Sequence, residues 1–350
     1  MTIEQQITAW SELGKILNAH ADKEKWHTGI SFITEEQYLS FEMRIEKSFF
    51  KNGWFEDSEV RNSLKEIAAW LQNDTLEKWL SDYMPLNSKD KTVAIIMAGN
   101  IPMVGFHDLL CVLLSGCHAK IKLSSEDDIL IPGIIDYITF VAPFYLDRIT
   151  FSDRKIGEFD AIIATGDQQS NQAFQTYFSS KPHLFRGHRT SVAILTGSET
   201  REDLKLLGSD IFQYFGRGCR NITHLCVPVD YNFETFFQEM LSFSNVIQNK
   251  KYGNNYDYHK AIHLMNLEVI LDNNFLLLKK TQELHAPIGM LYYHEYSTTE
   301  EVHEYLKLNE REIQCIIGHG FNPFGLAQKP KVDDYADNID TMKWLASLPF

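Results

Sequence analysis

The N-terminal part of the chain carries apolar residues at helical spacing. In the first such run the apolar positions are Ile7, Trp10, Leu13 and Leu17. A recurrence every three or four residues indicates amphipathic helices with one buried face. Thr2 and Thr34 stand where helix N-caps are expected. The pattern predicts a helical preface over residues 2–83.

From residue 91 the pattern changes to short apolar runs that alternate with helical segments. The expected strands are TVAIIMA (92–98), AKIKL (119–123), DAIIAT (160–165), SVAILTG (191–197) and THLCVPV (223–229). The expected helices cover 104–115, 129–140, 168–179, 202–215 and 333–348. This alternation is typical of βαβ units in a parallel sheet with both faces covered.

The sequence therefore predicts an α/β protein with doubly wound sheets and a nucleotide-binding architecture. We place a domain boundary near Arg189. Residues 1–190 would form the helical preface and a nucleotide-binding domain, 191–326 a catalytic domain, and 327–350 a C-terminal helical segment.

Composition and charge exclude several classes of function. The chain has 350 residues, of which 44% are hydrophobic, so it can bury a large core. A net charge of −14 disfavours nucleic acids and anionic membranes as partners. No apolar run is long enough to span a bilayer, and the N-terminus lacks the features of a signal peptide, so we expect a cytoplasmic protein.

The five cysteines are odd in number and form no CxxC pair. This favours a reduced protein without a metal site. The segment GRGCRN (216–221) resembles the start of the dinucleotide-binding fingerprint G-x-G-x-x-G. That fingerprint follows a strand and ends in glycine, whereas this segment follows a helix and ends in Asn221, so we regard the similarity as accidental. For an isolated cysteine, burial as a small apolar side chain is the usual role. We keep that interpretation for Cys111, Cys117, Cys226 and Cys315.

Six short motifs occur in an order that is known from one superfamily. They are IMAGNIPM (96–103), IKLSSE (121–126), ATGDQQSNQ (164–172), GRGC (216–219), ELHAPIG (283–289) and NPFG (322–325). Together they resemble the successive motifs of aldehyde dehydrogenases. The chain is most similar to the LuxC-type acyl-CoA reductases of that superfamily, which include the fatty-acid reductase component of bacterial luminescence.

The resemblance implies an aldehyde-dehydrogenase-like fold and a nucleophilic role for Cys219. A thiolate flanked by Arg217 and Arg220 has a lowered pKa, and the glycines before it permit close approach of a carbonyl group. The resemblance also implies that Asn100 and the Cys219 backbone amide stabilise an oxyanion. The activity it implies is NADPH-dependent reduction of an acyl-CoA or acyl-carrier thioester to an aldehyde.

The same resemblance implies a set of cofactor-binding residues. Lys122 would contact the adenosine ribose or its 2′-phosphate, with Ser125 or Glu126 nearby. Thr165 and Gly166 would contact the pyrophosphate, and Glu283 the nicotinamide ribose. Without the resemblance, Lys122 and Glu283 would be surface charges and 164–166 an ordinary tight turn. NADPH is the expected cofactor, with NADH as the alternative.

Two features depart from the aldehyde dehydrogenase pattern. Phe185 stands where aldehyde-oxidising members carry the glutamate that activates water, so the resemblance implies reduction of a thioester rather than hydrolysis of an acyl-enzyme. The segment MPLNSKDK (84–91) is too short for the usual oligomerisation hairpin. The superfamily's tetramer is therefore not expected, and homo-oligomerisation of another kind stays open.

Three other functions remain compatible with the sequence. They are an acyl-phosphate reductase of the glutamyl-phosphate type, a cofactor-independent cysteine acyltransferase, and a non-catalytic subunit that binds acyl groups or nucleotides. His107, Arg186, His188 and Arg189 have side chains suited to phosphate binding or proton transfer, but the sequence assigns them no role.

Overall fold

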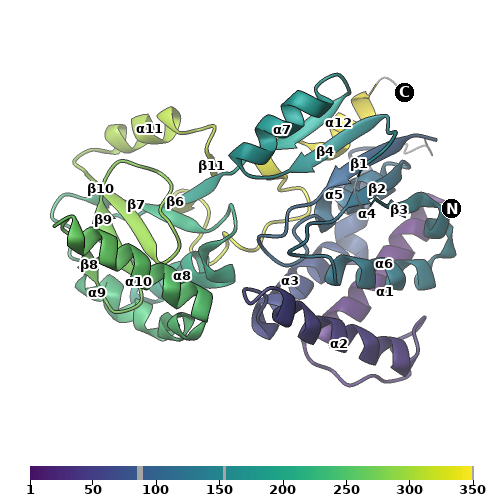
Figure 1. Ribbon diagram of the computed structural model, residues 1–350, viewed down its shortest axis with the longest axis horizontal. Helices are drawn as coiled ribbons and strands as arrows, with labels where there is room; N and C mark the ends of the chain where they lie inside the picture. Colours follow the sequence, from purple (N-terminus) through teal and green to yellow (C-terminus); the bar gives the residue numbers. More distant parts are fainter. Residues whose placement is uncertain (85–89, 153–154, 349–350) are drawn as a thin grey trace. The chain divides into compact units, whose positions relative to one another are not determined.

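The computed structural model describes residues 1–84, 90–152 and 155–348 (Figure 1). The chain divides into two compact units, one made of 1–187 with 331–350 and the other of 188–330. Most of the segment MPLNSKDK lies outside the described residues, so the prediction about the oligomerisation hairpin stays a prediction.

The helical preface of the first unit is present as expected. Its helices are α1 (Ile3–Ala21), α2 (Glu35–Lys51), α3 (Asp57–Trp70) and α4 (Asn73–Ser81). Thr2 and Thr34 cap α1 and α2, and in each case the glutamine three residues later accepts a hydrogen bond from the capping residue's backbone amide. These reciprocal hydrogen bonds satisfy amides that a helix start leaves unpaired. Trp10 of α1 is fully buried and donates a 2.8 Å hydrogen bond to Tyr145.

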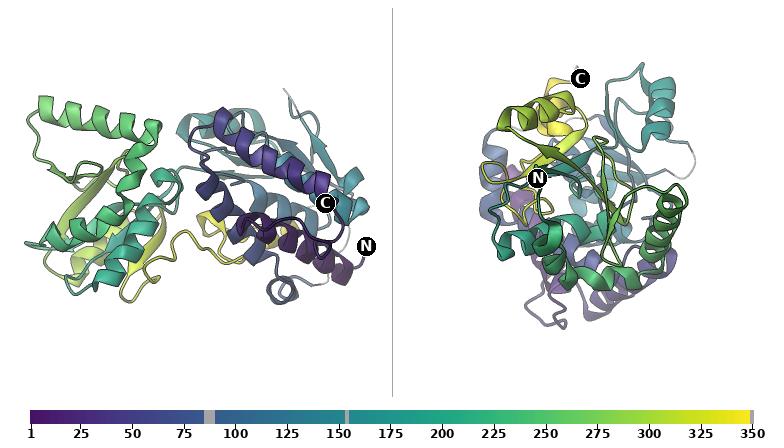
Figure 2. Two further views of the ribbon diagram at one scale, coloured as in Figure 1. Left: turned by 90° about the horizontal axis from the view of Figure 1, so that it is seen from below. Right: turned by 90° about the vertical axis from the view of Figure 1, so that its left-hand side faces the viewer.

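The first unit contains a parallel sheet of five strands in the order β3-β2-β1-β4-β5. The strands are β1 (Thr92–Ile96), β2 (His118–Lys122), β3 (Ile149–Phe151), β4 (Ala161–Thr165) and β5 (His183–Arg186). The central strands are nearly continuous apolar runs because helices cover both faces of such a sheet. The remaining elements are α5 (Phe106–Leu114), α6 (Leu130–Val141), η1 (Pro143–Arg148), α7 (Gln168–Phe178), η4 (Ala336–Asn338) and α12 (Thr341–Ser347). Figure 2 shows α1 and α2, in purple and dark blue, beside the sheet, where both contact α6.

The second unit contains a sheet of six strands in the order β11-β6-β7-β10-β9-β8. Its strands are β6 (Thr190–Ile194), β7 (Ile222–Pro228), β8 (Leu271–Asp272), β9 (Leu277–Lys280), β10 (Met290–Tyr296) and β11 (Ile313–Gly318). The pairing of β8 with β9 is antiparallel, and the other pairings are parallel. Its helices are α8 (Arg201–Phe212), η2 (Gln213–Gly216), α9 (Phe233–Met240), η3 (Leu241–Gln248), α10 (Lys250–Met265) and α11 (Thr299–Leu308). Two α/β units with a helical preface confirm the predicted fold class.

Two predicted helices differ most from the structure in their bounds. The helix expected over 202–215 ends at Phe212, because Tyr214 and Phe215 adopt left-handed backbone angles. The helix expected over 333–348 begins only at Thr341, where Asp340 caps it. Asp337 and Asn338 before it have positive φ, which these two residue types tolerate better than most.

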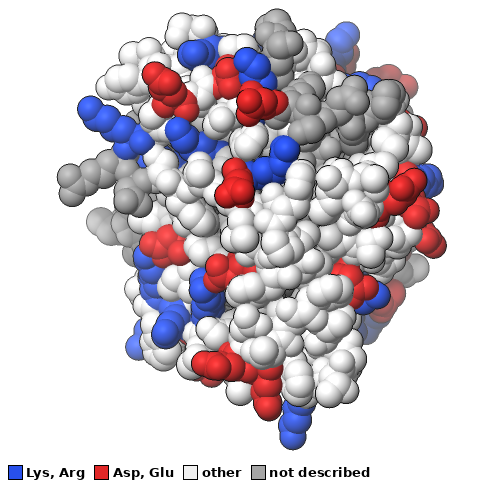
Figure 3. All heavy atoms as spheres, turned by 90° about the vertical axis from the view of Figure 1, so that its right-hand side faces the viewer, with Lys and Arg blue, Asp and Glu red and all other residues white. Residues whose placement is uncertain are grey.

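In the described part of the chain, no helix combines the length and the apolar character that a bilayer crossing requires. One face of the molecule carries lysine and arginine side chains interspersed with aspartate and glutamate around an uncharged area (Figure 3).

Candidate functional site

The structure gathers five of the predicted residues at one edge of the first sheet. Parallel strands have their carboxyl ends at the same edge, and ligands of open α/β sheets bind where the strand order reverses. Here that point lies between β1 and β4, since Ile96 pairs with Lys122 on one side and with Ala164 on the other. Lys122 ends β2 and is half-buried, and Thr165 ends β4. Asn100, Ser125 and Gly166 lie in the loops that follow these strands.

The turn that carries Asn100 is fixed by two side chains that the sequence did not single out. Asp127 accepts a 2.6 Å hydrogen bond from the Met103 amide, and Ser63 donates one of 2.8 Å to the Pro102 carbonyl. Met103 has a φ of 57°, a strained value that these contacts hold in place. At Gly99 a Cβ atom would lie 2.6 Å from the Ser124 hydroxyl oxygen, so glycine is required where the two loops meet.

Asp127 makes the stability of this unit depend on pH. Burial raises its pKa to about 7 from an ordinary value of 3.8. The folded state thus binds the Asp127 proton more tightly than the unfolded state does. The contribution of this proton to folding stability is therefore complete at low pH and disappears as the pH rises through about 7. We expect the stability of the wild type relative to Asp127→Asn to fall by about 2–3 kcal/mol between pH 5 and pH 8, measured by urea unfolding. Asp74→Asn, which removes an exposed carboxylate, is the control, and parallel curves for wild type and Asp127→Asn would contradict the prediction.

Backbone amides at the turn of Thr165 and Gly166 form hydrogen bonds within the protein. The Gly166 amide donates to the Arg186 carbonyl at 3.3 Å, and Asp167 caps α7 by accepting from the Ser170 amide at 2.8 Å. A carboxylate at this helix start occupies the position that a pyrophosphate would use. A Cβ on Gly166 would lie 2.5 Å from the Ser170 Cβ, so the glycine has a packing role. A role for Thr165 and Gly166 in cofactor binding stays a prediction.

Cys219 lies in the loop that leads from η2 into β7. Tyr214, Phe215 and Gly216 have φ values of 53°, 56° and 75°, so the chain turns through three left-handed residues just before this loop. Consecutive strained residues are common at functional sites. Cys219 is half-buried, whereas the other four cysteines are buried, and all five are free thiols. A strand and not a helix follows it, so no helix dipole acts on the thiol from that side.

Asn221 organises the loop around Cys219. Its buried side chain accepts a 2.7 Å hydrogen bond from the Gly218 amide. The same side chain donates to the carbonyls of Asp210, Ile211 and Gln213, where α8 ends. Ser191 adds a 3.1 Å hydrogen bond to the Cys219 carbonyl. The thiol therefore sits on a loop with a fixed backbone, which is a form of preorganisation.

We expect Asn221→Ala to lower the free energy of unfolding by at least about 3 kcal/mol, because several buried polar groups lose their partner at once. Chemical denaturation of the purified protein measures this. Asn322→Ala, which removes one exposed side-chain hydrogen bond to Ile316, is the control and should change stability by less than about 1 kcal/mol. Equal losses in the two variants would show that Asn221 does not organise the loop.

A second buried side chain attaches the motif NPFG to the same helix. Asp210 accepts hydrogen bonds from the amides of Gly325 and Ala327 at 2.7 and 2.9 Å. Burial raises its pKa to about 6, although these two hydrogen bonds oppose the shift. Sequence reasoning missed Asp210, Asn221 and Asp127 because each acts through contacts that only the folded chain creates.

Glu283 lies in the segment that precedes β10. Its side chain is exposed, while its carbonyl accepts a 2.8 Å hydrogen bond from His224. Thr223 donates to the neighbouring Leu284 carbonyl at 2.9 Å. The backbone of this segment is thereby tied to β7, and the carboxylate stays accessible.

Of the four unassigned polar residues, Arg186 and His107 make structural contacts in the first unit. Arg186 is buried and forms an ion pair with Asp108 at 2.8 Å, and it also donates to the Ala336 carbonyl and the Thr341 hydroxyl. His107 contacts the Val332 carbonyl at 2.8 Å. These contacts attach the C-terminal segment to the first unit. In the second unit, Arg189 donates to the Ile313 carbonyl and the ring of His188 lies 5.0 Å from that of His285.

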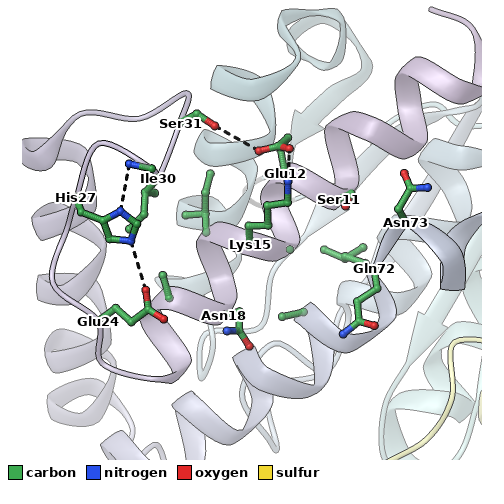
Figure 4. A pocket seen from close by; sticks show the side chains of 16 residues that line it. Ser11, Glu12, Lys15, Asn18, Glu24, His27, Ile30, Ser31, Gln72 and Asn73 are labelled. Atoms are coloured by element: carbon green, nitrogen blue, oxygen red, sulfur yellow. Dashed lines mark hydrogen bonds and ion pairs between the residues drawn. The ribbon is translucent and has the colours of Figure 1, made fainter.

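A pocket of about 440 Å³ lies on the helical preface. It is lined by α1, the following loop and the region where α3 meets α4 (Figure 4). Its polar groups contact one another: Lys15 pairs with Glu12 at 2.6 Å, and Ser31 donates to Glu12 at 3.3 Å. None of the residues that line it is a predicted site residue.

Comparison with solved structures shows the fold. The chain is similar to an NADP-dependent enzyme from E. coli, with 11% identity, a TM-score of 0.64, and coverage of 91% of this chain and 73% of that one. It is also similar to an indole-3-acetaldehyde dehydrogenase in complex with NAD⁺, with 11% identity, a TM-score of 0.64 and coverage of 91% and 72%. For an aldehyde dehydrogenase from Bacillus cereus the identity is 13%, the TM-score 0.62 and the coverage 91% and 72%. The protein thus has the aldehyde dehydrogenase fold.

No protein-family model matches the sequence, and a search of curated proteins finds no match.

Proposed function

We propose that the protein reduces an acyl thioester, an acyl-CoA or acyl-carrier thioester, to an aldehyde with NADPH. The observation that carries the proposal is Cys219, a half-exposed thiol on a preorganised loop in a protein with the aldehyde dehydrogenase fold. The other thiols are buried.

Lys122 and Ser125, at the carboxyl edge of the first sheet, support binding of a nicotinamide dinucleotide. Lys122 offers a positive charge beside β1, at the place where such sheets bind ligands. Ser125 follows in an exposed loop, and Glu283 offers an accessible carboxylate in the other unit. When bound, the reduced cofactor supplies the hydride. Lys122 favours NADPH, and NADH is the alternative.

In the proposed reaction the Cys219 thiolate attacks the thioester carbonyl, the carbon–sulfur bond to the carrier breaks, and the carrier leaves as its thiol. Asn100 and the Cys219 amide donate hydrogen bonds to the oxygen that becomes negative. After hydride transfer to the acyl carbon, collapse of the oxyanion expels the Cys219 thiolate and releases the aldehyde. Each turnover consumes one proton and one hydride.

Phe185 supports reduction over hydrolysis. It lies on β5, where its ring packs at 4.3 Å from His183 and at 5.9 Å from Phe174 in a mainly apolar cluster. This position therefore supplies no carboxylate to activate water.

A panel of acyl-CoA substrates of different chain length, incubated with NADPH, tests the proposal. With NADPH present, we expect its absorbance to fall. In a separate incubation without NADPH, we expect an acyl adduct in the intact mass of the protein. Reduction of glutamyl phosphate instead would identify an acyl-phosphate reductase. Acyl transfer without any cofactor would identify an acyltransferase, and nucleotide or acyl binding without turnover a non-catalytic subunit.

We expect the acyl-enzyme to hydrolyse slowly in the absence of NADPH. General-base assistance is worth about a hundredfold or more, and Phe185 provides none. With aldehyde and oxidised cofactor, the reaction should stop after one turnover unless coenzyme A is added as acceptor. Stopped-flow absorbance and time-resolved intact mass measure both effects. Repeated turnover to free acid without a thiol would instead assign the protein to ordinary aldehyde oxidation.

A further inference from the structure

Three potential metal ligands meet in the core of the second unit. His224 and Cys226 lie two residues apart on β7 and therefore on the same face of the strand. His294 on β10 pairs in register with Cys226. One ligand atom from each of the three side chains lies within 4.8 Å of the other two. All three residues are buried, with exposed fractions of 0%, 0% and 7%.

Hydrogen bonds direct the ring nitrogens of His224. Its Nδ1 donates to the Glu283 carbonyl at 2.8 Å, since a carbonyl can only accept. The Nε2 lone pair then faces inwards, 2.6 Å from Nδ1 of His294. Histidines that bind metals are held in the same way, with one ring nitrogen donating to a carbonyl or carboxylate and the other bound to the ion.

The three side chains lie in mainly apolar surroundings. Cys226 packs in a cluster with Val192, Ile194 and Val302, and the Tyr305 ring lies 5.0 and 4.3 Å from the two imidazole rings. Neutral imidazole is the form that binds metal ions, whereas a thiol must lose its proton first.

We propose that His224, Cys226 and His294 form a binding site for a zinc(II) ion. Two nitrogens and one sulfur suit zinc and exclude magnesium and calcium, which prefer oxygen ligands. Binding displaces the Cys226 proton, and the His294 proton moves from Nδ1 to Nε2. Nε2 of His224 and Nδ1 of His294 are 2.6 Å apart in the metal-free structure. Because zinc–nitrogen bonds of about 2.0–2.1 Å in a tetrahedral site place two nitrogens about 3.3 Å apart, these two atoms separate when the ion binds. Water takes the fourth position.

This site goes beyond the proposed reductase activity and differs from the sequence-based expectation of no metal site. Cysteine spacing could not reveal it, because His224 and His294 are 70 residues apart and meet only through strand pairing. His224 also holds the carbonyl of Glu283, so a bound ion would rigidify the segment that carries this carboxylate.

Zinc titration of the metal-free full chain tests the proposal. We expect one equivalent of zinc to remain after desalting, with release of about one proton per ion. At about a hundredfold excess over Kd, the Tm should rise on the order of 5 °C. Cobalt(II) should give the near-ultraviolet thiolate-to-cobalt band.

Variants locate the ion. Cys226→Ala and His294→Gln should each weaken zinc binding at least about tenfold, and Cys226→Ala, which removes the sulfur, should also abolish the cobalt band. Val192→Ala, which removes volume from the same cluster but no ligand, controls for packing damage and should keep the band. Loss of the band in Cys219→Ser but not in Cys226→Ala would place the ion on the accessible thiol and overturn the proposal. Absence of retained zinc in the wild type would leave a hydrogen-bonded imidazole pair and would also overturn it.

Discussion

Cys219→Ala should abolish both the acyl adduct and NADPH oxidation, with a rate loss of at least about 10⁴-fold. Removal of a nucleophile eliminates the covalent route, and in enzymes of this type little catalysis remains through other groups. Cys219 is the half-exposed thiol of the chain, so no buried cysteine can replace it without local unfolding. Intact mass after incubation with an acyl-CoA and spectrophotometry of NADPH measure the two effects.

Cys117→Ala is the matched control. It removes a thiol of the same size from a fully buried position in the first unit. We expect a lower unfolding temperature with the adduct still forming at wild-type stoichiometry. An adduct that disappears in Cys117→Ala but persists in Cys219→Ala would exclude Cys219 as the nucleophile.

Asn100→Ala should lower the rate of NADPH oxidation by about a hundred- to a thousandfold, because one preorganised oxyanion donor is typically worth that much. The affinity for NADPH should stay within about twofold, since the donor is needed for the charge that develops in the reaction and not for the nucleotide. Steady-state kinetics and direct titration of NADPH binding separate these two effects.

A second variant distinguishes loss of the donor from loss of its position. Ser63→Ala removes the 2.8 Å hydrogen bond to the Pro102 carbonyl and leaves the Asn100 amide intact. Its rate should fall between those of the wild type and Asn100→Ala. Asn18→Ala, on the helical preface, should have no effect on the rate. An unchanged rate in Asn100→Ala would remove this residue from the proposed mechanism.

The elements of the fold were largely predictable because they rest on local patterns. The continuous apolar runs of β1 and β4 require burial on both faces, which only a covered parallel sheet provides. Thr2 and Thr34 were recognisable as caps because a capping box needs only residues three positions apart. The end of α8 was not predictable, since neither Tyr214 nor Phe215 signals a left-handed turn.

The parts of the candidate site are predictions from resemblance, and the side chains that support them could not be predicted from the sequence. Asn221 has no motif of its own, and its role depends on the end of α8 lying beside the Cys219 loop. Asp127 reaches the Asn100 turn only because β2 pairs with β1. His224 and Cys226 stand in an apolar run, where each is ordinarily a core residue. Long-range polar contacts of this kind follow from the folded topology and leave no local pattern in the sequence.

The attachment of the C-terminal segment to the first unit has a consequence for synthesis on the ribosome. The second unit, 188–330, is an uninterrupted stretch of chain, whereas the first needs residues from both ends. Until Ala336 and Thr341 emerge, Arg186 lacks two of its three partners, and Tyr335 is not yet available to accept the hydrogen bond from Trp79. The unit whose residues are made first is therefore completed last: all five strands of its sheet precede residue 187, whereas these contacts form only after residues 335–341 have emerged.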